Sequence, residues 1–234
     1  EGEHPLLKRA GALYDWCAKK VVRIEEDEMF VGNVGTEWRS THPYVEWGIK
    51  WLEDALSLPE EDFIREWQSP GVFAYISPEN RIVFEDAVAY WKGRTIQDYV
   101  VSVLPEEILE LAGDNCTSFG NRYGEFVFSD ICQGHYCTNY RKVINKGWGY
   151  IRDEAQQHMD TMRGRVFDDD ARRFTFWRAI RKIAEGATLL TRRYAALVAD
   201  EALKCTGERR LELERMAQSL EWIASMPART ISAT

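Results

Sequence analysis

The chain has 234 residues, which at about 150 residues per domain allows one or two domains. It carries 30 Lys and Arg against 38 Asp and Glu, and its formal net charge is −8. This acidity argues against general nucleic-acid binding, which needs clustered cations. No stretch approaches the roughly 18 apolar residues of a membrane span, and no signal peptide is visible. The composition is that of a globular protein, with no nucleic-acid or membrane partner expected.

Five cysteines, an odd number without the regular spacing of a disulfide framework, favour reduced thiols and a cytoplasmic location. The densest group is Cys132, His135 and Cys137, all potential zinc ligands. A zinc site needs four ligands, usually in two paired halves, and no C-x2-C pair is present. We interpret the group as packed thiols, with a metal or iron–sulfur site as the weaker alternative.

Helical periodicity dominates the first part of the chain. A stripe of apolar side chains at three- and four-residue steps predicts a helix over Pro5–Lys20. Val21–Phe30 is interpreted as a short extended piece or turn. The next helix is expected to begin at Pro43, because proline in the first turn of a helix loses no hydrogen bond. Residues 57–81 are rich in proline and should be mostly loop with one short helix. A further helix is predicted over Arg81–Trp91.

The middle of the chain has weaker signals. Thr95, with Asp98 three residues later, has the spacing of a helix start. Gly113–Gly134 lacks a helical period, and we interpret it as a loop with a strand near Glu125–Phe128. Helical periodicity returns over Tyr140–Ile151, where two glycines interrupt it.

The strongest periodicity lies in the last third. From Phe176 to Leu197, apolar residues alternate steps of four and three while Arg and Lys fill the other faces, which predicts one long amphipathic helix. A second helix follows Gly207, with apolar residues at helical spacing from Leu213 to Ile223. Three aspartates precede the long helix, where negative charge is favourable. We expect an antiparallel helix pair packed into a larger, mainly α-helical body.

Residue patterns alone do not predict a reaction. No Ser-His-Asp set and no paired carboxylates can be picked out. Gly32–Gly35 looks like the beginning of a phosphate loop but lacks the Lys and Ser/Thr that complete one, so a tight turn is the better interpretation. His135 follows a glycine, which permits close backbone approach. His135 could therefore stand at a pocket edge or, as an alternative, be exposed or structural.

Several segments, in order along nearly the whole chain, together resemble the pyruvate formate-lyase-like glycyl radical enzymes. Tyr90–Thr95 resembles the signature YWKGKT, and Gly134–Gly147 resembles GH…Y.KVL..G. Arg193–Ala195, with the residues that follow it to Thr230, resembles RYA…D..RK.EL…P.RTF. The weaker matches are Pro5–Ala10, Phe30–Asn33, Pro43–Leu56 and Leu104–Glu107.

The resemblance implies that residues 1–234 are the N-terminal, mainly helical portion of the family's ten-stranded α/β barrel, with few short strands. In members that dehydrate hydroxylated substrates, the histidine of the GH motif contacts the substrate hydroxyl, and this role carries over to His135. Eight residues before this histidine, family members have an aromatic residue that forms part of the substrate pocket wall. In this sequence Val127 occupies that position. His135 and Val127 are the expected substrate-binding residues, and no catalytic residue or metal ligand is expected.

The reactive loops of the family have no match. Its thiyl-forming cysteine lies in a GCVE-like loop and its radical glycine in an RVSGY-like loop, and neither occurs in this sequence. We therefore expect a fragment, a truncated product or one part of a split enzyme, inactive by itself. The intact anaerobic enzyme would be a radical lyase, foremost a dehydratase acting on a small hydroxylated substrate. Decarboxylation and C–N or C–S cleavage remain open.

The resemblance also implies partners. In the family the organic radical is a glycyl radical, installed by a radical S-adenosylmethionine (SAM) activase, and no bound cofactor is implied. The expected partners are the small-molecule substrate, the activase, a companion chain with the cysteine and glycine loops, and a second copy in a homodimer. The rival interpretations are a non-catalytic helical binding module and a structural subunit that completes a separate chain's barrel. Uncovered apolar faces would make the isolated chain associate.

Overall fold

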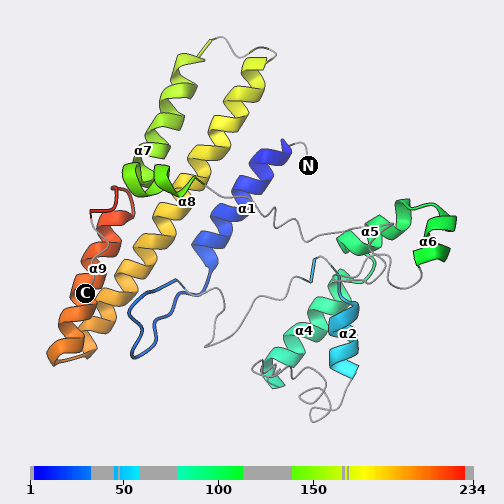
Figure 1. The fold of residues 1–234 in the computed structure, drawn as a ribbon, viewed down its shortest axis with the longest axis horizontal. Helices are drawn as coiled ribbons and strands as arrows, with labels where there is room; N and C mark the ends of the chain where they lie inside the picture. The colour runs from blue at the N-terminus through cyan, green and yellow to red at the C-terminus, as the bar shows by residue number, and fades with distance from the viewer. Residues whose placement is uncertain are drawn as a thin grey trace. The chain divides into compact units, whose positions relative to one another are not determined.

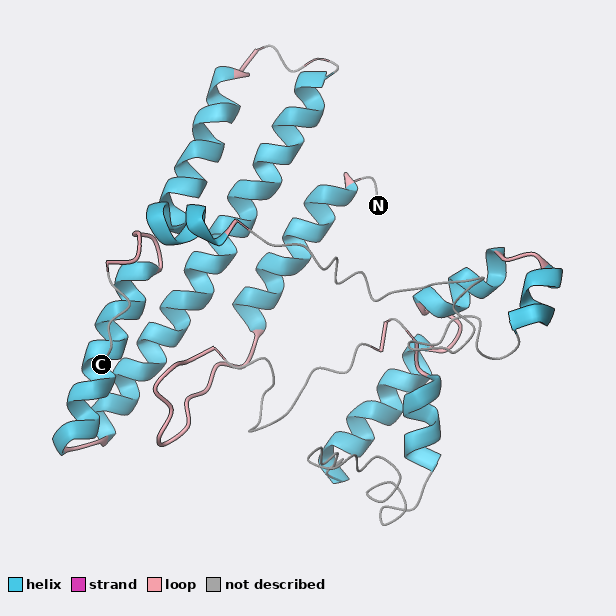
Figure 2. Ribbon diagram, viewed as in Figure 1, coloured by secondary structure: helices cyan, strands magenta, loops and turns pink. Residues whose placement is uncertain are grey.

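The computed structural model describes residues 3–32, 45–46, 48–57, 78–112, 139–164, 167 and 169–229. The chain forms two compact units: Glu1–Thr41 joins Cys137–Thr234 in one, and His42–Tyr136 forms the other. The described elements are all helices, and no strand occurs among these residues (Figure 2). The predicted mainly α class is confirmed, whereas the strand predicted near Glu125–Phe128 lies outside the described residues.

The long helix α8 (Asp169–Lys204) is the centre of the first unit. Three helices pack against it: α1 (Pro5–Lys19), α7 (Tyr140–Thr161) and α9 (Gly207–Ile223). Figure 1 shows α7 beside one half of α8 and α9 running back along the other half. The predicted antiparallel pair of long helices is therefore confirmed, and α1 and α7 complete its packing.

Three neighbours explain which side chains α8 buries. Its buried residues are Ala179, Ala184, Gly186, Thr188, Tyr194, Ala195, Val198 and Ala202. Of the predicted apolar stripe only Tyr194 is buried, and Phe176 at its start is 46% exposed. The predicted amphipathic helix is present, but most of its apolar stripe is only half-buried, because small residues on several faces let three helices approach closely. At Gly186 an added Cβ would lie 3.2 Å from the Cα of Tyr14 in α1.

The corner between α8 and α9 carries the apolar core of this unit. Gly207 has φ of 65° at the start of α9, a conformation that side chains other than glycine rarely adopt. Val198, Ala202 and Leu213 are buried together there. Residues 21–32 are non-helical with a turn at 26–27, as predicted, and their Ile24 packs against this cluster.

The second unit contains four short helices. They are α2 (Lys50–Ser57), α4 (Pro78–Trp91), α5 (Ile96–Val103) and α6 (Glu106–Ala112). α2 packs against α4, with Leu52 fully buried. Lys92 Nζ lies 3.2 Å from Glu53 Oε1, and the Arg81 guanidinium donates to the carbonyl oxygen of Leu56, so both ends of α4 are tied to α2.

The helix predicted to begin at Pro43 begins instead at Lys50, and Pro43 itself lies outside the described residues. The carbonyl oxygen of Glu46 accepts a hydrogen bond from the backbone N–H of Ile96, 3.0 Å away. It therefore serves the start of α5 rather than a helical turn of its own. The helix predicted over Arg81–Trp91 is confirmed as part of α4. In the part of the chain that the structure describes, no helix is long and apolar enough to cross a bilayer.

Candidate functional site

The two expected substrate contacts, His135 and Val127, lie outside the described residues, as do Cys132 and Cys137. The next described residue along the chain is Asn139. Its side-chain oxygen accepts a hydrogen bond from the N–H of Lys142, 3.2 Å away, and so caps α7. The structure therefore describes the helix that follows the GH motif in sequence.

Two glycines of α7 are required by close backbone packing. Gly147 has φ of 78°, and a Cβ there would lie 2.5 Å from the carbonyl carbon of Met226. At Gly149 a Cβ would lie 2.6 Å from the carbonyl oxygen of Ser225. The Gly149 N–H donates to that same oxygen at 2.8 Å. α7 is kinked at Gly147, and the chain after α9 packs directly against the kink.

The residues after α9 continue this contact. The Ala228 N–H donates to the carbonyl oxygen of Ile144 at 2.9 Å. The Trp222 indole N–H donates to the carbonyl oxygen of Pro227 at 2.8 Å, and the Arg229 guanidinium lies 3.2 Å from the centre of the Trp222 ring. Two segments that carry the family resemblance, one in α7 and one after α9, therefore meet in space. Together they fix the first two turns of α7.

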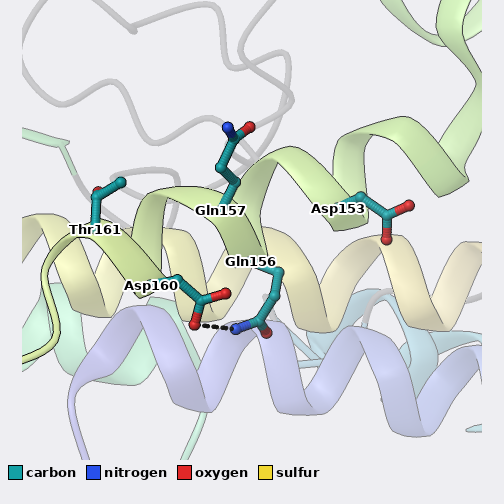
Figure 3. Close-up of a pocket in the computed structure, with 5 residues that line it drawn as sticks. All are labelled: Asp153, Gln156, Gln157, Asp160 and Thr161. Carbon is teal, nitrogen blue, oxygen red and sulfur yellow. Dashed lines mark hydrogen bonds between the residues drawn. The ribbon is translucent and has the colours of Figure 1, made fainter.

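A shallow polar depression of about 550 Å³ lies along the second half of α7. Its lining residues are Asp153, Gln156, Gln157, Asp160 and Thr161 (Figure 3). The Gln156 side-chain N–H donates to Asp160 Oδ1 at 3.0 Å, and its amide oxygen accepts from Arg181 of α8 at 2.6 Å. These bonds fix the side chain of Gln156 between α7 and α8.

The carboxylates of this depression already have cationic partners. Asp153 lies 2.7 Å from the Arg152 guanidinium and Asp160 lies 3.1 Å from that of Arg163. Exposed pairs of this kind are solvated and contribute little. Across the described ranges, no group of three His, Cys, Asp or Glu side chains is arranged to hold a metal ion. The depression thus has the character of a hydrated surface and offers no nucleophile or acid–base pair.

Two arginines of the family-like motifs anchor the N-terminal segment. Arg193 of α8 donates to the carbonyl oxygens of Cys17 and Lys20, both at 2.7 Å, and so binds the C-terminal end of α1. Arg209 of α9 donates to the carbonyl oxygens of Glu25 and Glu28 at 3.3 and 3.0 Å. Both motifs act here as clamps that join chain segments far apart in sequence.

The reactive side chains near these clamps are electrostatically disfavoured as nucleophiles. Burial raises the pKa of the Cys17 thiol, against a smaller opposing effect of Arg193. Burial also raises the pKa of the Tyr194 phenol, and the negative charge of Glu28 adds to the increase. A thiol needs a lowered pKa to act as a thiolate nucleophile. Cys17 therefore has a packing role, consistent with the absence of a GCVE-like context.

The YWKGKT-like motif ends in a capping box at the start of α5. The Thr95 side chain accepts from the Asp98 N–H at 3.0 Å, and the Asp98 carboxylate accepts from the Thr95 N–H at 2.9 Å. Thr95 is only 3% exposed. The sequence prediction of a helix start at these two residues is confirmed.

Sequence reasoning missed the arginine clamps, the packing at Gly147 and a groove of about 430 Å³ beside α9. The glycine pair in a helical region was a usable signal for a close backbone approach. The partners of the arginines were not predictable, because Arg193 bonds a carbonyl 176 residues away.

A family model described as pyruvate formate lyase-like matches residues 1–232. The chain belongs to the pyruvate formate lyase-like family. Among curated relatives, isethionate sulfite-lyase of Desulfovibrio desulfuricans is 28% identical over 235 residues, 98% of this chain and 27% of the relative. The probable dehydratase YbiW of Escherichia coli is 27% identical over 96% of this chain and 26% of its own length. The chain thus spans about a quarter of these relatives.

Solved structures show the same fold. The glycerol-bound B12-independent glycerol dehydratase from Clostridium butyricum superposes with a TM-score of 0.77 at 24% identity, over 98% of this chain and 28% of the dehydratase. A glycyl radical enzyme from Archaeoglobus fulgidus gives a TM-score of 0.72 at 18% identity, with the same coverage of both chains. The helices of this pyruvate formate lyase-like chain therefore follow one portion of the glycyl radical enzyme fold.

Proposed function

We propose that residues 1–234 form the N-terminal part of a pyruvate formate lyase-like domain whose intact form is a radical lyase. The family match over residues 1–232 carries this proposal. Dehydration of a small hydroxylated substrate is the favoured reaction, because relatives include the (2S)-3-sulfopropanediol dehydratase of Klebsiella oxytoca, 24% identical over 93% of this chain and 25% of its own length. The glycerol dehydratase, alike in fold, is named for the same class of reaction.

In this proposal His135 contacts the substrate hydroxyl and Val127 forms part of the pocket wall. A hydroxyl group leaves readily only as water, so a group that can donate a proton assists C–O cleavage. Imidazole changes charge near neutral pH and can supply that proton. The capped start of α7, four residues after His135, supports the role, because a helix fixed at Gly147 limits the positions open to the loop before it.

The radical itself belongs to polypeptide outside this chain in our proposal. The sequence contains neither a GCVE-like nor an RVSGY-like loop, so we assign no radical step to its residues. A companion polypeptide would carry both loops, with a radical SAM activase and a second copy of the assembly as further partners. The helices of this chain would help to enclose the reaction and exclude water from it.

Cleavage of a C–S bond is the second candidate. Isethionate sulfite-lyases from several bacteria are 26–28% identical to this chain, including that of Bilophila wadsworthia at 26% over 97% of the chain and 27% of the relative. The two candidates differ in the leaving group, which is water in one and sulfite in the other. Product analysis therefore separates them.

The test begins with co-purification of the full chain and mass spectrometry of whatever binds it. We expect a companion polypeptide with the cysteine and glycine loops. With the activase, under anaerobic conditions, this complex should dehydrate glycerol or a related diol, and His135→Ala should lower kcat by about 100-fold. The chain alone should give no glycyl radical signal in electron paramagnetic resonance.

Each other result changes the conclusion. Sulfite release from isethionate would replace dehydration by the second candidate. A glycyl radical doublet in the electron paramagnetic resonance spectrum of the chain alone would refute the assignment of the radical to a companion polypeptide. Activity unchanged in His135→Ala would remove the assigned role of that residue. The absence of any companion would favour a non-catalytic binding module.

A further inference from the structure

α7 is bent so sharply at Gly147 that two side chains far apart along it meet. Lys142 Nζ, in the first turn, lies 2.5 Å from Glu154 Oε2, twelve residues later. Twelve residues of unbroken α-helix would separate the two Cα atoms by about 18 Å, which is farther than the extended side chains reach together. Figure 1 shows the first turns of α7 lying across the direction of the rest of the helix. The ion pair can therefore form only in the bent helix.

The chain after α9 contacts α7 on both sides of the bend. Before the bend, the Ile144 carbonyl oxygen accepts a hydrogen bond from the Ala228 N–H at 2.9 Å. After the bend, the Gly149 N–H donates to the Ser225 carbonyl oxygen at 2.8 Å. In an unbroken helix the Ile144 oxygen would instead face the N–H of Trp148. A straight α7 would thus lose the hydrogen bond from Ala228 together with the ion pair.

The ion pair across the bend is partly shielded from solvent. The side chains of Lys142 and Glu154 are 39% and 21% exposed, whereas those of the Arg152–Asp153 pair in the same helix are 42% and 67% exposed. Fully exposed pairs contribute little to stability. Removing Lys142 would leave the carboxylate of Glu154 partly buried without this counter-charge, which is the costly case. The pair therefore favours the bent form of α7.

We propose that Lys142 and Glu154 are positioning residues: their ion pair holds α7 bent at Gly147, and the bend sets the direction in which the chain enters the helix from the GH motif. His135 precedes Lys142 by seven residues, so the bend constrains the segment that carries it. The ion pair and the bend follow from the described contacts alone, whereas the link to His135 rests on the proposed function.

The experiment is hydrogen exchange of the full chain, followed by NMR at the amide of Ala228. Lys142→Glu and Glu154→Lys, each alone, place like charges together, and we expect the Ala228 N–H to exchange about tenfold faster as the bend opens. The double variant exchanges the two charges and should restore the wild-type rate. Arg152→Glu is the matched control, because Arg152 is similarly exposed and its partner Asp153 also lies after the bend. It should leave the Ala228 rate unchanged.

The imidazole resonances of His135, identified with His135→Gln, separate positioning from stability. They should shift in either single variant and return in the double variant. Those of His4, which caps α1, should stay unchanged throughout. A pair that only stabilises the fold would change the exchange at Ala228 without moving the His135 resonances, and that result would overturn the positioning role.

Three further results would overturn the proposal: exchange at Ala228 that is unchanged in the single variants, exchange that is equally fast in Arg152→Glu, and a double variant that restores neither readout. If circular dichroism shows that a reversed charge prevents folding, Lys142→Met replaces it, since it removes the charge and keeps the side-chain length, and it should also speed exchange at Ala228. Turnover by the assembled enzyme tests the proposed function separately. A lack of turnover with these NMR results intact would reject only that function.

Discussion

The Thr95–Asp98 capping box shows how a single residue pair sets the pH response of a helix start. The Thr95 hydroxyl bonded to the carboxylate, together with backbone N–H donors around it, lowers the pKa of Asp98. A carboxylate with a lowered folded-state pKa stabilises the fold above its ordinary pKa near 4. That contribution is lost as the pH falls through the folded-state value.

Replacing Thr95 by Ala should therefore lower the free energy of unfolding of the second unit by about 1 kcal/mol, the usual effect of losing a helix cap. Asp98→Asn should cost stability at pH 7, and the difference from wild type should shrink progressively below pH 4. Urea unfolding monitored by circular dichroism at several pH values measures both effects. A difference from wild type that stays constant down to pH 2 would contradict the assignment to the charged carboxylate.

Gly147 and Gly164 offer a matched comparison of backbone strain and steric fit. Their φ values are 78° and 77°, yet a Cβ at Gly164 would meet nothing within 4 Å, whereas one at Gly147 would overlap the backbone of Met226. Gly164→Ala should cost only the left-handed strain, about 1 kcal/mol. Gly147→Ala should cost at least about 2 kcal/mol more, because the chain after α9 must move away. Equal losses of unfolding free energy would show that the contact with Met226 is unimportant.

At the scale of helices, α8 is held by neighbours that approach through small residues. Gly186 allows α1 to come so close that a methyl group would press on the backbone of Tyr14. His158 of α7 stacks on Trp177 of α8, with ring centres 4.0 Å apart and planes within 8°. α1 therefore contacts α8 through a close backbone approach, and α7 contacts it through stacked rings. A single hydrophobic stripe along α8 does not predict either kind of contact.

Gly11 in α1 serves as a control for Gly186, since an added Cβ there would meet nothing within 4 Å. Gly11→Ala should raise the free energy of unfolding by about 0.5–1 kcal/mol, the gain in helix propensity. Gly186→Ala gains the same propensity but should lower stability overall, because α1 must shift. Hydrogen exchange should become faster in α1 for Gly186→Ala alone. A stabilised Gly186→Ala variant would contradict this account of the α1–α8 contact.

The helices were largely predictable from sequence, because their apolar spacing and caps are local signals. α1 was predicted within one residue of its observed bounds and α4 within three, and the start of α5 was predicted at its capping box. The periodic stretches that predicted α7 and α8 were shorter than the helices, which end at Thr161 and Lys204. The start of α2 was predicted at Pro43 and not at Lys50, because the carbonyl oxygen of Glu46 accepts a hydrogen bond from the backbone N–H of Ile96, fifty residues later in the chain. Buried faces were predicted less well than helix positions, since burial depends on which helices become neighbours.

For the whole molecule, family membership was predictable from ordered short motifs, and the match over residues 1–232 confirms it. The roles of His135 and Val127 stay predictions, because both residues lie outside the described part of the chain. The groove beside α9 could not be predicted, since it joins Met29–Val31 to residues near 210. Contacts between segments so far apart leave no local pattern in the sequence.

The packing of α1 on α8 has a consequence during synthesis. Arg193, which binds the carbonyl oxygens at the end of α1, is translated more than 170 residues after them. At about 5–20 residues per second, α1 waits roughly 10–35 s before its partner helix leaves the ribosome. The intervening unit, His42–Tyr136, is complete well before then. A nascent chain stalled before α8 should therefore be the species that most needs chaperones.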